Sequence, residues 1–227
     1  MAVPPPPNAP IQPFEIQGES LKTWSFPSPR TERVRVKLGT EGRPLNCEID
    51  LWQGPDNTPN KIRVYVEDGK QREFSCVVEL PKGGNTLCVR NTAHMEFPMF
   101  AVAEPLGPGG APVFEDGTAR TIQGGALRTY AFEGDVASVQ VFLQTDGRPL
   151  NARIELLQGP NNIKQVMEIY TEDGMERPFY AVVETPGTGN VVRVVNTASM
   201  EFPMTAAVEA FEVGDSSYLE GVRLGGL

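Results

Sequence analysis

Short runs of alternating apolar and polar residues recur along most of the chain. Residues 33–38 read Arg-Val-Arg-Val-Lys-Leu, and residues 47–51 and 62–66 repeat the alternation. A period of two residues is that of a β-strand with one buried face. Turn residues separate the runs, and six or seven such strands in about 90 residues are typical of a β-sandwich. The pattern therefore predicts an all-β fold.

The whole pattern occurs twice. Val34 to Glu104 aligns with Val139 to Glu209 at a constant offset of 105 and without a gap. About 38 pairs are identical, which indicates a duplication. The blocks shared include EGRPLN with DGRPLN, QGPDN with QGPNN, and NTAHMEFPM with NTASMEFPM. We expect two tandem, homologous β-sandwich-like domains.

The repeat sets the expected boundaries. The β-domains span 16–105 (copy one) and 122–211 (copy two), and a linker rich in Gly and Pro spans 106–121. Residues 1–15 are expected to form an extended arm, because Pro4 to Pro7 favour polyproline geometry. Residues 212–227 form a C-terminal tail that either folds back or docks on another molecule.

Shared glycines and polar residues have expected structural roles. Gly42, Gly69 and Gly84, with Gly147, Gly174 and Gly189 in copy two, lie where hairpin turns need positive φ. Asn91 and Asn196 are expected to satisfy local backbone groups at a strand end. Arg43 and its copy Arg148 each follow a turn, where we expect the arginine to pair with a nearby carboxylate.

Composition narrows the classes of function. The formal net charge is -9 and the pI is near 4.8, which disfavours nucleic acid and anionic membranes as partners. No apolar run has the length of a membrane-spanning helix. The start MAVPPPPNAP has no signal pattern, so we expect either an untargeted chain or one from which a plastid or secretory presequence has been removed.

Residues suited to catalysis are scarce. His94 is the only histidine, and Cys47, Cys76 and Cys88 lack the spacing of a metal or redox site. Copy two has Ser199 in place of His94 and no cysteine. The acidic Glu67-Asp68-Gly69 turn and its copy favour solvated turns over calcium ligands. We expect no enzyme activity, no cofactor and no metal.

The charges are divided unequally between the copies. Copy one has 12 Lys and Arg against 12 Asp and Glu, whereas copy two has 6 against 11. The basic strand of copy one, Arg33, Arg35 and Lys37, is replaced by Ser138, Gln140 and Phe142. Neutral drift explains this, or else the basic strand contacts copy two or the tail of a neighbouring molecule. The candidate self-assembly residues are Arg33, Arg35, Lys37, Phe211, Tyr218, Leu219, Val222 and Leu224.

An alternative function is a tandem module that binds carbohydrate or another ligand. Trp52 and Tyr65 are expected on an outer face, where aromatic rings could stack on a sugar. Leu157 replaces Trp52 in copy two, which argues against a duplicated sugar platform.

The blocks LWQGPDN and LLQGPNN, VYVEDG and IYTEDG, VVELPKGGN and VVETPGTGN, and NTAHMEFPM and NTASMEFPM resemble the tandem regions of the diatom pyrenoid shell proteins, known as PyShell. The resemblance covers residues 16–211 and a short hydrophobic extension. It implies two related β-domains in pseudo-twofold relation and no catalytic residues. It also implies self-assembly into a sheet around the Rubisco condensate, which supports carbon dioxide fixation. The implied location is the chloroplast stroma at the pyrenoid periphery, and the implied partners are the chain itself and components of the condensate.

Overall fold

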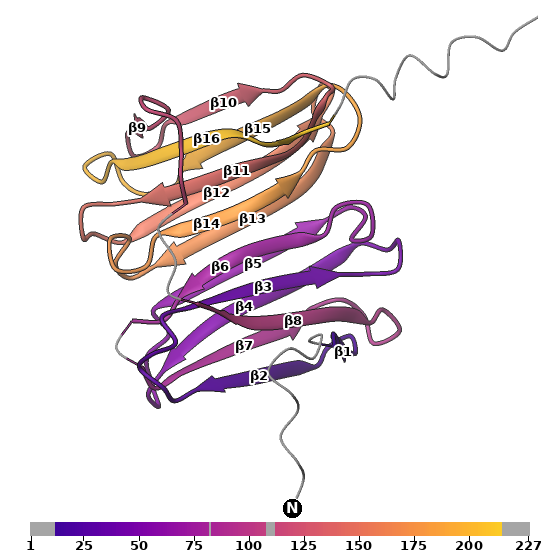
Figure 1. Cartoon of the computed structure of the whole chain (residues 1–227), viewed down its shortest axis with the longest axis vertical. Helices are drawn as coiled ribbons and strands as arrows, with labels where there is room; N and C mark the ends of the chain where they lie inside the picture. Colours follow the sequence, from indigo (N-terminus) through magenta and orange to yellow (C-terminus); the bar gives the residue numbers. More distant parts are fainter. Residues whose placement is uncertain (1–11, 82, 108–111, 215–227) are drawn as a thin grey trace, which may run out of the picture.

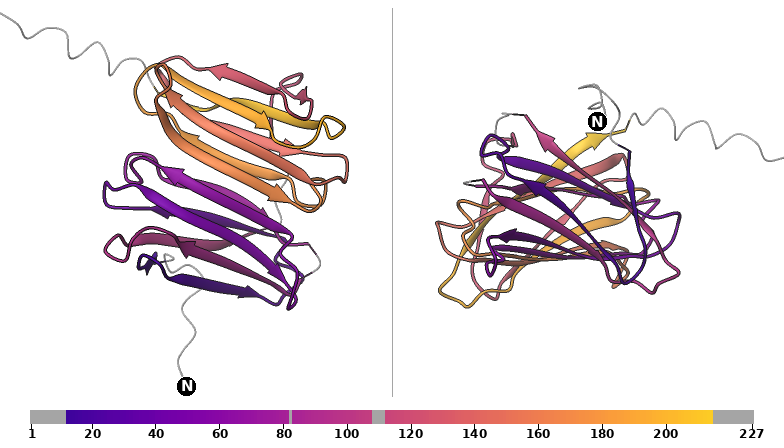
Figure 2. Two further views of the ribbon diagram at one scale, coloured as in Figure 1. Left: turned by 180° about the vertical axis from the view of Figure 1, so that it is seen from behind. Right: turned by 90° about the horizontal axis from the view of Figure 1, so that it is seen from below.

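The structure is a computed structural model that describes residues 12–81, 83–107 and 112–214. These residues form sixteen β-strands and no helix, in two eight-stranded antiparallel sheets. Figure 1 shows the strands of both copies, and Figure 2 shows the sheets as two layers. The predicted all-β, sandwich-like fold is therefore confirmed.

Each copy contributes four strands to each sheet. Sheet A has the order β1-β8-β3-β6-β14-β11-β16-β9. Its strands are β1 (Phe14–Ile16), β8 (Met99–Leu106), β3 (Arg33–Gly39), β6 (Phe74–Glu79), β14 (Phe179–Glu184), β11 (Val136–Gln144), β16 (Met204–Val213) and β9 (Arg120–Ile122).

Sheet B has the order β10-β15-β12-β13-β5-β4-β7-β2. Its strands are β10 (Leu127–Ala131), β15 (Asn190–Asn196), β12 (Leu150–Gln158), β13 (Ile163–Thr171), β5 (Asn60–Val66), β4 (Leu45–Gln53), β7 (Asn85–Asn91) and β2 (Leu21–Phe26). Each order reads as the strands of one copy followed by the equivalent strands of the other in reverse.

The two copies meet strand to strand in both layers. In sheet A, β14 pairs with β6, so that Ala181 lies opposite Cys76. In sheet B, β13 pairs with β5 along its length, with Ile169 opposite Ile62. The reversed order is what a twofold relation between copies produces, and that relation and the division into two domains stay predictions.

Alternation along each strand produces the core. On β3, Val34, Val36 and Leu38 are fully buried, while Lys37 is exposed. One cluster of buried apolar side chains contains residues of both sheets and both copies. The sequence pattern predicted the interior strands, but it missed β1, β2, β9 and β10. These strands are short or only half buried, so their alternation is weak.

The structure corrects one expectation about glycine. Gly42, Gly84, Gly147 and Gly189 have positive φ as predicted, but Gly69 and Gly174 do not. A Cβ on Gly69 would lie 2.7 Å from Oγ1 of Thr40. Gly69 and Gly174 are therefore explained by the close approach of another segment.

Candidate interaction surfaces

The junction between the copies is built from reciprocal contacts. Nη2 of Arg72 donates to Oε1 of Gln158 at 3.0 Å, and Nη2 of Arg177 donates to Oε1 of Gln53 at 3.1 Å. Both arginines are buried, with 2% and 4% of their surface exposed. Each glutamine also donates to the backbone carbonyl of a proline after β6 or β14, namely Pro81 or Pro186. These side chains therefore tie the two copies together beside the strand pairs.

Sequence reasoning missed these four residues. Arg72 and Arg177 occupy equivalent positions, as do Gln53 and Gln158. Identity between the copies was their signal, because a polar residue kept in both copies is a candidate for a buried contact. Nothing in the sequence indicated that the contact crosses from one copy to the other.

The predicted basic strand lies in the middle of sheet A, on its outer face. Arg33 lies opposite Glu79 in the register, and Nη1 of Arg35 is 3.3 Å from Oε1 of Glu104. Lys37 is exposed. The strand is therefore accompanied by carboxylates of its own sheet. Its predicted role as a contact between molecules stays a prediction.

The equivalent face of copy two is covered by the linker. Nε2 of Gln140 donates to the carbonyl oxygen of Val113 at 3.0 Å, and the rings of Phe114 and Phe142 lie 6.0 Å apart. The backbone N–H of Glu115 donates to Oε2 of Glu209 at 3.1 Å. Two of the residues that replace the basic strand, Gln140 and Phe142, thus hold the linker. The contact with the linker therefore gives a structural reason for the loss of the basic residues in copy two, which the sequence alone left open.

The candidate tail residues are only partly described. Phe211 lies on β16, with 50% of its surface exposed, at a bulge in the pairing of β16 with β11. Tyr218, Leu219, Val222 and Leu224 lie outside the described residues. Their predicted insertion into an adjacent subunit stays a prediction.

The stability of the folded chain depends on pH through Glu79, which lies on the outer face of sheet A. Burial raises the pKa of its carboxyl from 4.5 to about 7; Arg33 opposes the shift and Glu32 adds to it. The folded state thus binds this proton more tightly than the unfolded state, so stability falls as pH rises from about 4.5 to about 7. Burial also raises the pKa of Glu184, the equivalent residue of copy two.

We therefore expect Glu79→Gln to raise the melting temperature at pH 7.5 and to change it little at pH 4.5. Thermal unfolding of both proteins at both pH values measures this. Glu41→Gln, at an exposed turn, is the control and should have no such pH dependence. Equal effects of Glu79→Gln on the melting temperature at the two pH values would contradict the raised pKa of Glu79.

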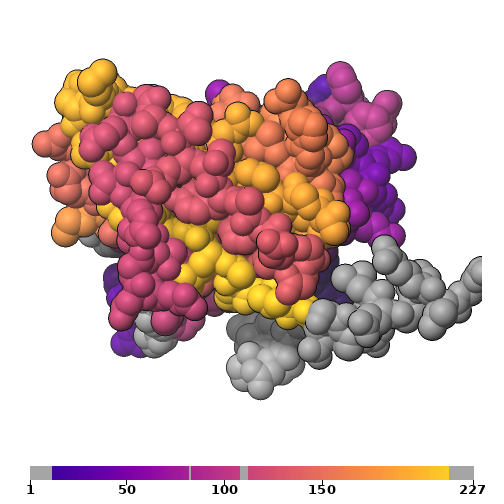
Figure 3. Space-filling view, turned by 90° about the horizontal axis from the view of Figure 1, so that it is seen from above, coloured from indigo at the N-terminus to yellow at the C-terminus, as the bar shows by residue number. Residues whose placement is uncertain are grey.

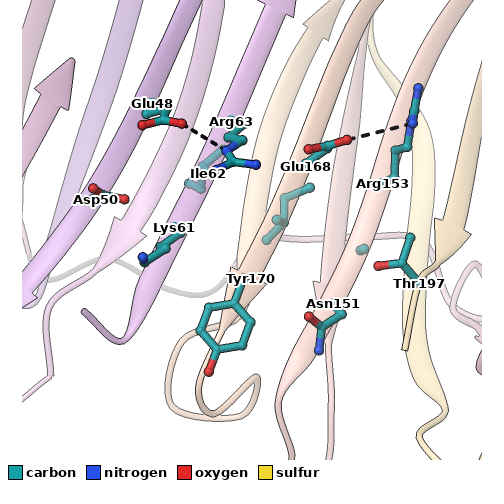
Figure 4. A pocket seen from close by; sticks show the side chains of 12 residues that line it. Glu48, Asp50, Lys61, Ile62, Arg63, Asn151, Arg153, Glu168, Tyr170 and Thr197 are labelled. Atoms are coloured by element: carbon teal, nitrogen blue, oxygen red, sulfur yellow. Dashed lines mark hydrogen bonds and ion pairs between the residues drawn. The ribbon is translucent and has the colours of Figure 1, made fainter. Parts of the chain in front are cut away.

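The outer face of sheet B carries a row of alternating charges across the junction. Glu48, Arg63, Glu168 and Arg153 follow one another on β4, β5, β13 and β12 (Figure 4). Nε of Arg63 is 3.0 Å from Oε1 of Glu48, and Nη1 of Arg153 is 3.8 Å from Oε1 of Glu168. Opposite charges on neighbouring strands support the pairing that joins the copies.

A groove of about 480 Å³ opens along this row. Asp50, Lys61 and Tyr170 also line it (Figure 4). Tyr65, on β5, is the equivalent of Tyr170, and more than a third of each tyrosine surface is exposed. Trp52, in contrast, is half buried. The groove offers charged groups and one aromatic ring to a polar ligand.

Both sheets end in open edge strands at opposite ends of the long axis. β1 and β2 form one end, and β9 and β10 the other (Figure 1). In Figure 3 the rose-coloured segment that includes β9 and β10 covers the copy-two end. The edges of sheet A have only three paired residues each, whereas β2 has six residues and β10 has five. Exposed Leu21 and Leu127 occupy equivalent positions on these longer edges.

The shared asparagines have the predicted structural role. Nδ2 of Asn91 donates to the carbonyl oxygens of Ile16 and Phe97 at 3.0 and 2.8 Å, and its Oδ1 accepts from the N–H of Ala93. Asn196 makes the equivalent bonds. These amides anchor the short edge strands β1 and β9. The expected carboxylate pair is found for Arg148, whose Nε lies 3.7 Å from Oδ1 of Asp146. For Arg43 the expectation was wrong, because its Nη1 donates to the backbone carbonyl of Glu96 and its guanidinium lies over the Phe97 ring.

The cysteines have the environment of core residues. Cys47, Cys76 and Cys88 are free and buried, and burial raises the pKa of each thiol. The thiolate is the reactive form. We expect a thiol reagent at pH 8 to modify none of them rapidly in the folded chain and all three after denaturation. Rapid modification of a native cysteine, measured by mass, would contradict this environment.

Neither a metal site nor a membrane-spanning helix is found in the described part of the chain. Residues 12–81, 83–107 and 112–214 contain no group of three or more His, Cys, Asp or Glu side chains placed to hold a metal ion. Within the same ranges, no helix has the length and apolar character needed to cross a membrane.

Three comparisons with known proteins give one informative match. A comparison with curated protein sequences finds no match. Among solved structures, one similar chain is that of infectious bursal disease virus, Gx strain, at 11% identity and a TM-score of 0.15. The alignment covers 81% of this chain and 61% of the viral chain, so this chain spans less than two thirds of it. The family described as diatom pyrenoid shell protein matches residues 7–210. That match includes both copies and the linker between them, and the chain therefore belongs to the diatom pyrenoid shell protein family.

Proposed function

We propose that this chain is a structural protein that assembles with copies of itself into a sheet-like shell around the Rubisco-containing pyrenoid, without catalytic activity. The family places the chain with proteins of the pyrenoid, which lies within the chloroplast. The finer location, the stroma at the pyrenoid periphery, and contact with components of the Rubisco condensate belong to this proposal. A continuous shell supports carbon dioxide fixation by confining the enzyme.

The observation that carries the proposal is the pair of open edges of sheet B. Strands β2 and β10 lie at opposite ends of the molecule, and among the described residues each pairs with a strand on one side only and leaves one row of backbone groups unpaired. A contact between β2 of one molecule and β10 of the next uses two different surfaces. Such contacts leave a free surface at each end and therefore propagate.

The basic strand is the second proposed contact. Lys37 is its exposed member and can meet the acidic copy two of a neighbouring molecule. We expect Lys37→Glu to raise the protein concentration at which assembly begins, most strongly at low salt, because exposed charges are screened by ions. Lys70→Glu, at an exposed turn, is the matched control. Light scattering against concentration measures the threshold, and equal thresholds for the two variants would contradict this contact.

Assembly itself is tested on the purified chain. Sedimentation should show large particles above a threshold concentration, and negative-stain electron microscopy should show sheets or tubes. A chain that stays monomeric at every soluble concentration would contradict the proposed function.

A tandem ligand-binding module is the second candidate, and the groove beside Tyr170 favours it. Binding on a glycan array by the monomeric chain, lost in Tyr170→Ala, would support this function. Unchanged binding by Tyr170→Ala, or none by the wild type, would contradict it.

A further inference from the structure

The outer face of sheet A has two equivalent grooves, one for each copy. The linker enters the first beside Leu106 and Gly107, where Val77, Glu79 and Phe142 also line the groove. The second groove, of about 340 Å³, contains the equivalent residues, at the offset of 105 between the copies: Phe211, Glu212, Val182, Glu184 and Lys37. The first groove thus receives the segment that follows copy one. The second begins where the segment that follows copy two departs.

One stretch of the tail has the same apolar-apolar-acidic pattern as the linker segment that docks. At the same offset, Val113-Phe114-Glu115 aligns with Tyr218-Leu219-Glu220. In the linker these residues present a backbone carbonyl, an apolar side chain and a backbone N–H to copy two. The tail offers the same three groups in the same order.

Copy one keeps partners for these groups. Glu104 is the equivalent of Glu209, which accepts the N–H of Glu115. Arg35 replaces Gln140 and can likewise donate to a carbonyl oxygen. Lys37 replaces Phe142, and its methylene chain can cover an apolar side chain while its ammonium meets an acidic one. Leu219 followed by Glu220 matches that combination.

We propose that residues 215–224 occupy the second groove of their own molecule, with Leu219 against Lys37 and Glu220 near the Lys37 ammonium. Phe211 and Glu212 line the groove, so the tail starts at its mouth. The tail then crosses from copy two to copy one, as the linker crosses from copy one to copy two. This geometry favours the tail's own molecule over the adjacent subunit expected from sequence, and it does not require assembly. It is an alternative to the proposed contact between Lys37 and copy two of a neighbouring molecule, because a tail that covers Lys37 excludes that contact.

Cross-linking of the full chain tests the proposal. Cysteines are placed by Lys37→Cys and Leu219→Cys, and a short bis-maleimide joins them; the three native cysteines are buried. Phe114→Cys with Phe142→Cys is the positive control, because those rings are in contact. Thr23→Cys with Leu219→Cys is the negative control, because Thr23 lies on β2 of the other sheet. Equal amounts of ¹⁴N- and ¹⁵N-labelled chains are mixed before the reaction, and thermal unfolding confirms that each variant folds.

The expected result is a 37–219 cross-link within one chain, several-fold more abundant than the 23–219 cross-link. A yield no higher than the negative control would overturn the proposal. Cross-links found mainly between ¹⁴N and ¹⁵N chains would also overturn it and would assign the tail to a neighbour. Neither result decides the proposed shell function, because sedimentation and electron microscopy detect sheets wherever the tail lies.

Discussion

Replacing Arg72 and Arg177 with alanine should lower the free energy of unfolding by about 2–3 kcal/mol for each residue. Each buried guanidinium satisfies a glutamine of the other copy, Gln158 or Gln53. Its removal leaves that amide oxygen without a partner and opens a cavity at the junction. Urea unfolding of the single and double variants measures the loss.

Arg63→Ala is the matched control for this prediction. Arg63 also contacts a side chain across the sheet, Glu48, but 69% of its side chain is exposed. An exposed ion pair contributes about 0–1 kcal/mol. Losses as small for Arg72→Ala as for Arg63→Ala would show that the reciprocal contacts do not hold the copies together.

Proline at the open edges of sheet B should abolish assembly while leaving the fold intact. The N–H of Phe132 donates to Asn190, and the N–H of Asn196 donates to Ala126. Antiparallel bonds alternate along a strand, so Thr129 directs its N–H away from β15. The N–H of Asn91 donates to Ser20, which places Thr23 in the same position on β2. Proline removes only these outward donors.

The variant Thr23→Pro/Thr129→Pro should remain monomeric in sedimentation at concentrations where the wild type forms sheets. Thr23→Val/Thr129→Val keeps both N–H groups and is the control, which should assemble. Circular dichroism and thermal unfolding verify that the proline variant folds. Sheets of normal appearance from a folded proline variant would exclude the open edges as the contact.

The sequence predicted what depends on local pattern. Residues 33–38 alternate strictly, and the structure places them in a central strand with its valines and leucine buried. Asn91 and Asn196 were expected to satisfy backbone groups, and they do. Both features follow from the requirements of one strand or one strand end.

Contacts between distant segments could not be predicted in the same way. Alternation along β5 is the same whether its neighbour is β4 or β13, so nothing indicated that both sheets continue through both copies. The linker was expected to be irregular, and its docking through Phe114 depends on Phe142, which looked like one substitution on a solvated face. The charge difference between the copies was visible in the sequence. Its structural role became clear only from the position of the linker on copy two.

In the proposed assembly, molecules join into rows through the open edges of sheet B, and a second, lateral contact joins the rows into a sheet. A cryo-electron microscopy reconstruction of assembled wild-type protein tests it most directly. We expect β2 of one molecule to lie about 4.7–4.9 Å from β10 of the next, the spacing of hydrogen-bonded strands. An assembly in which β2 and β10 both face solvent would contradict it.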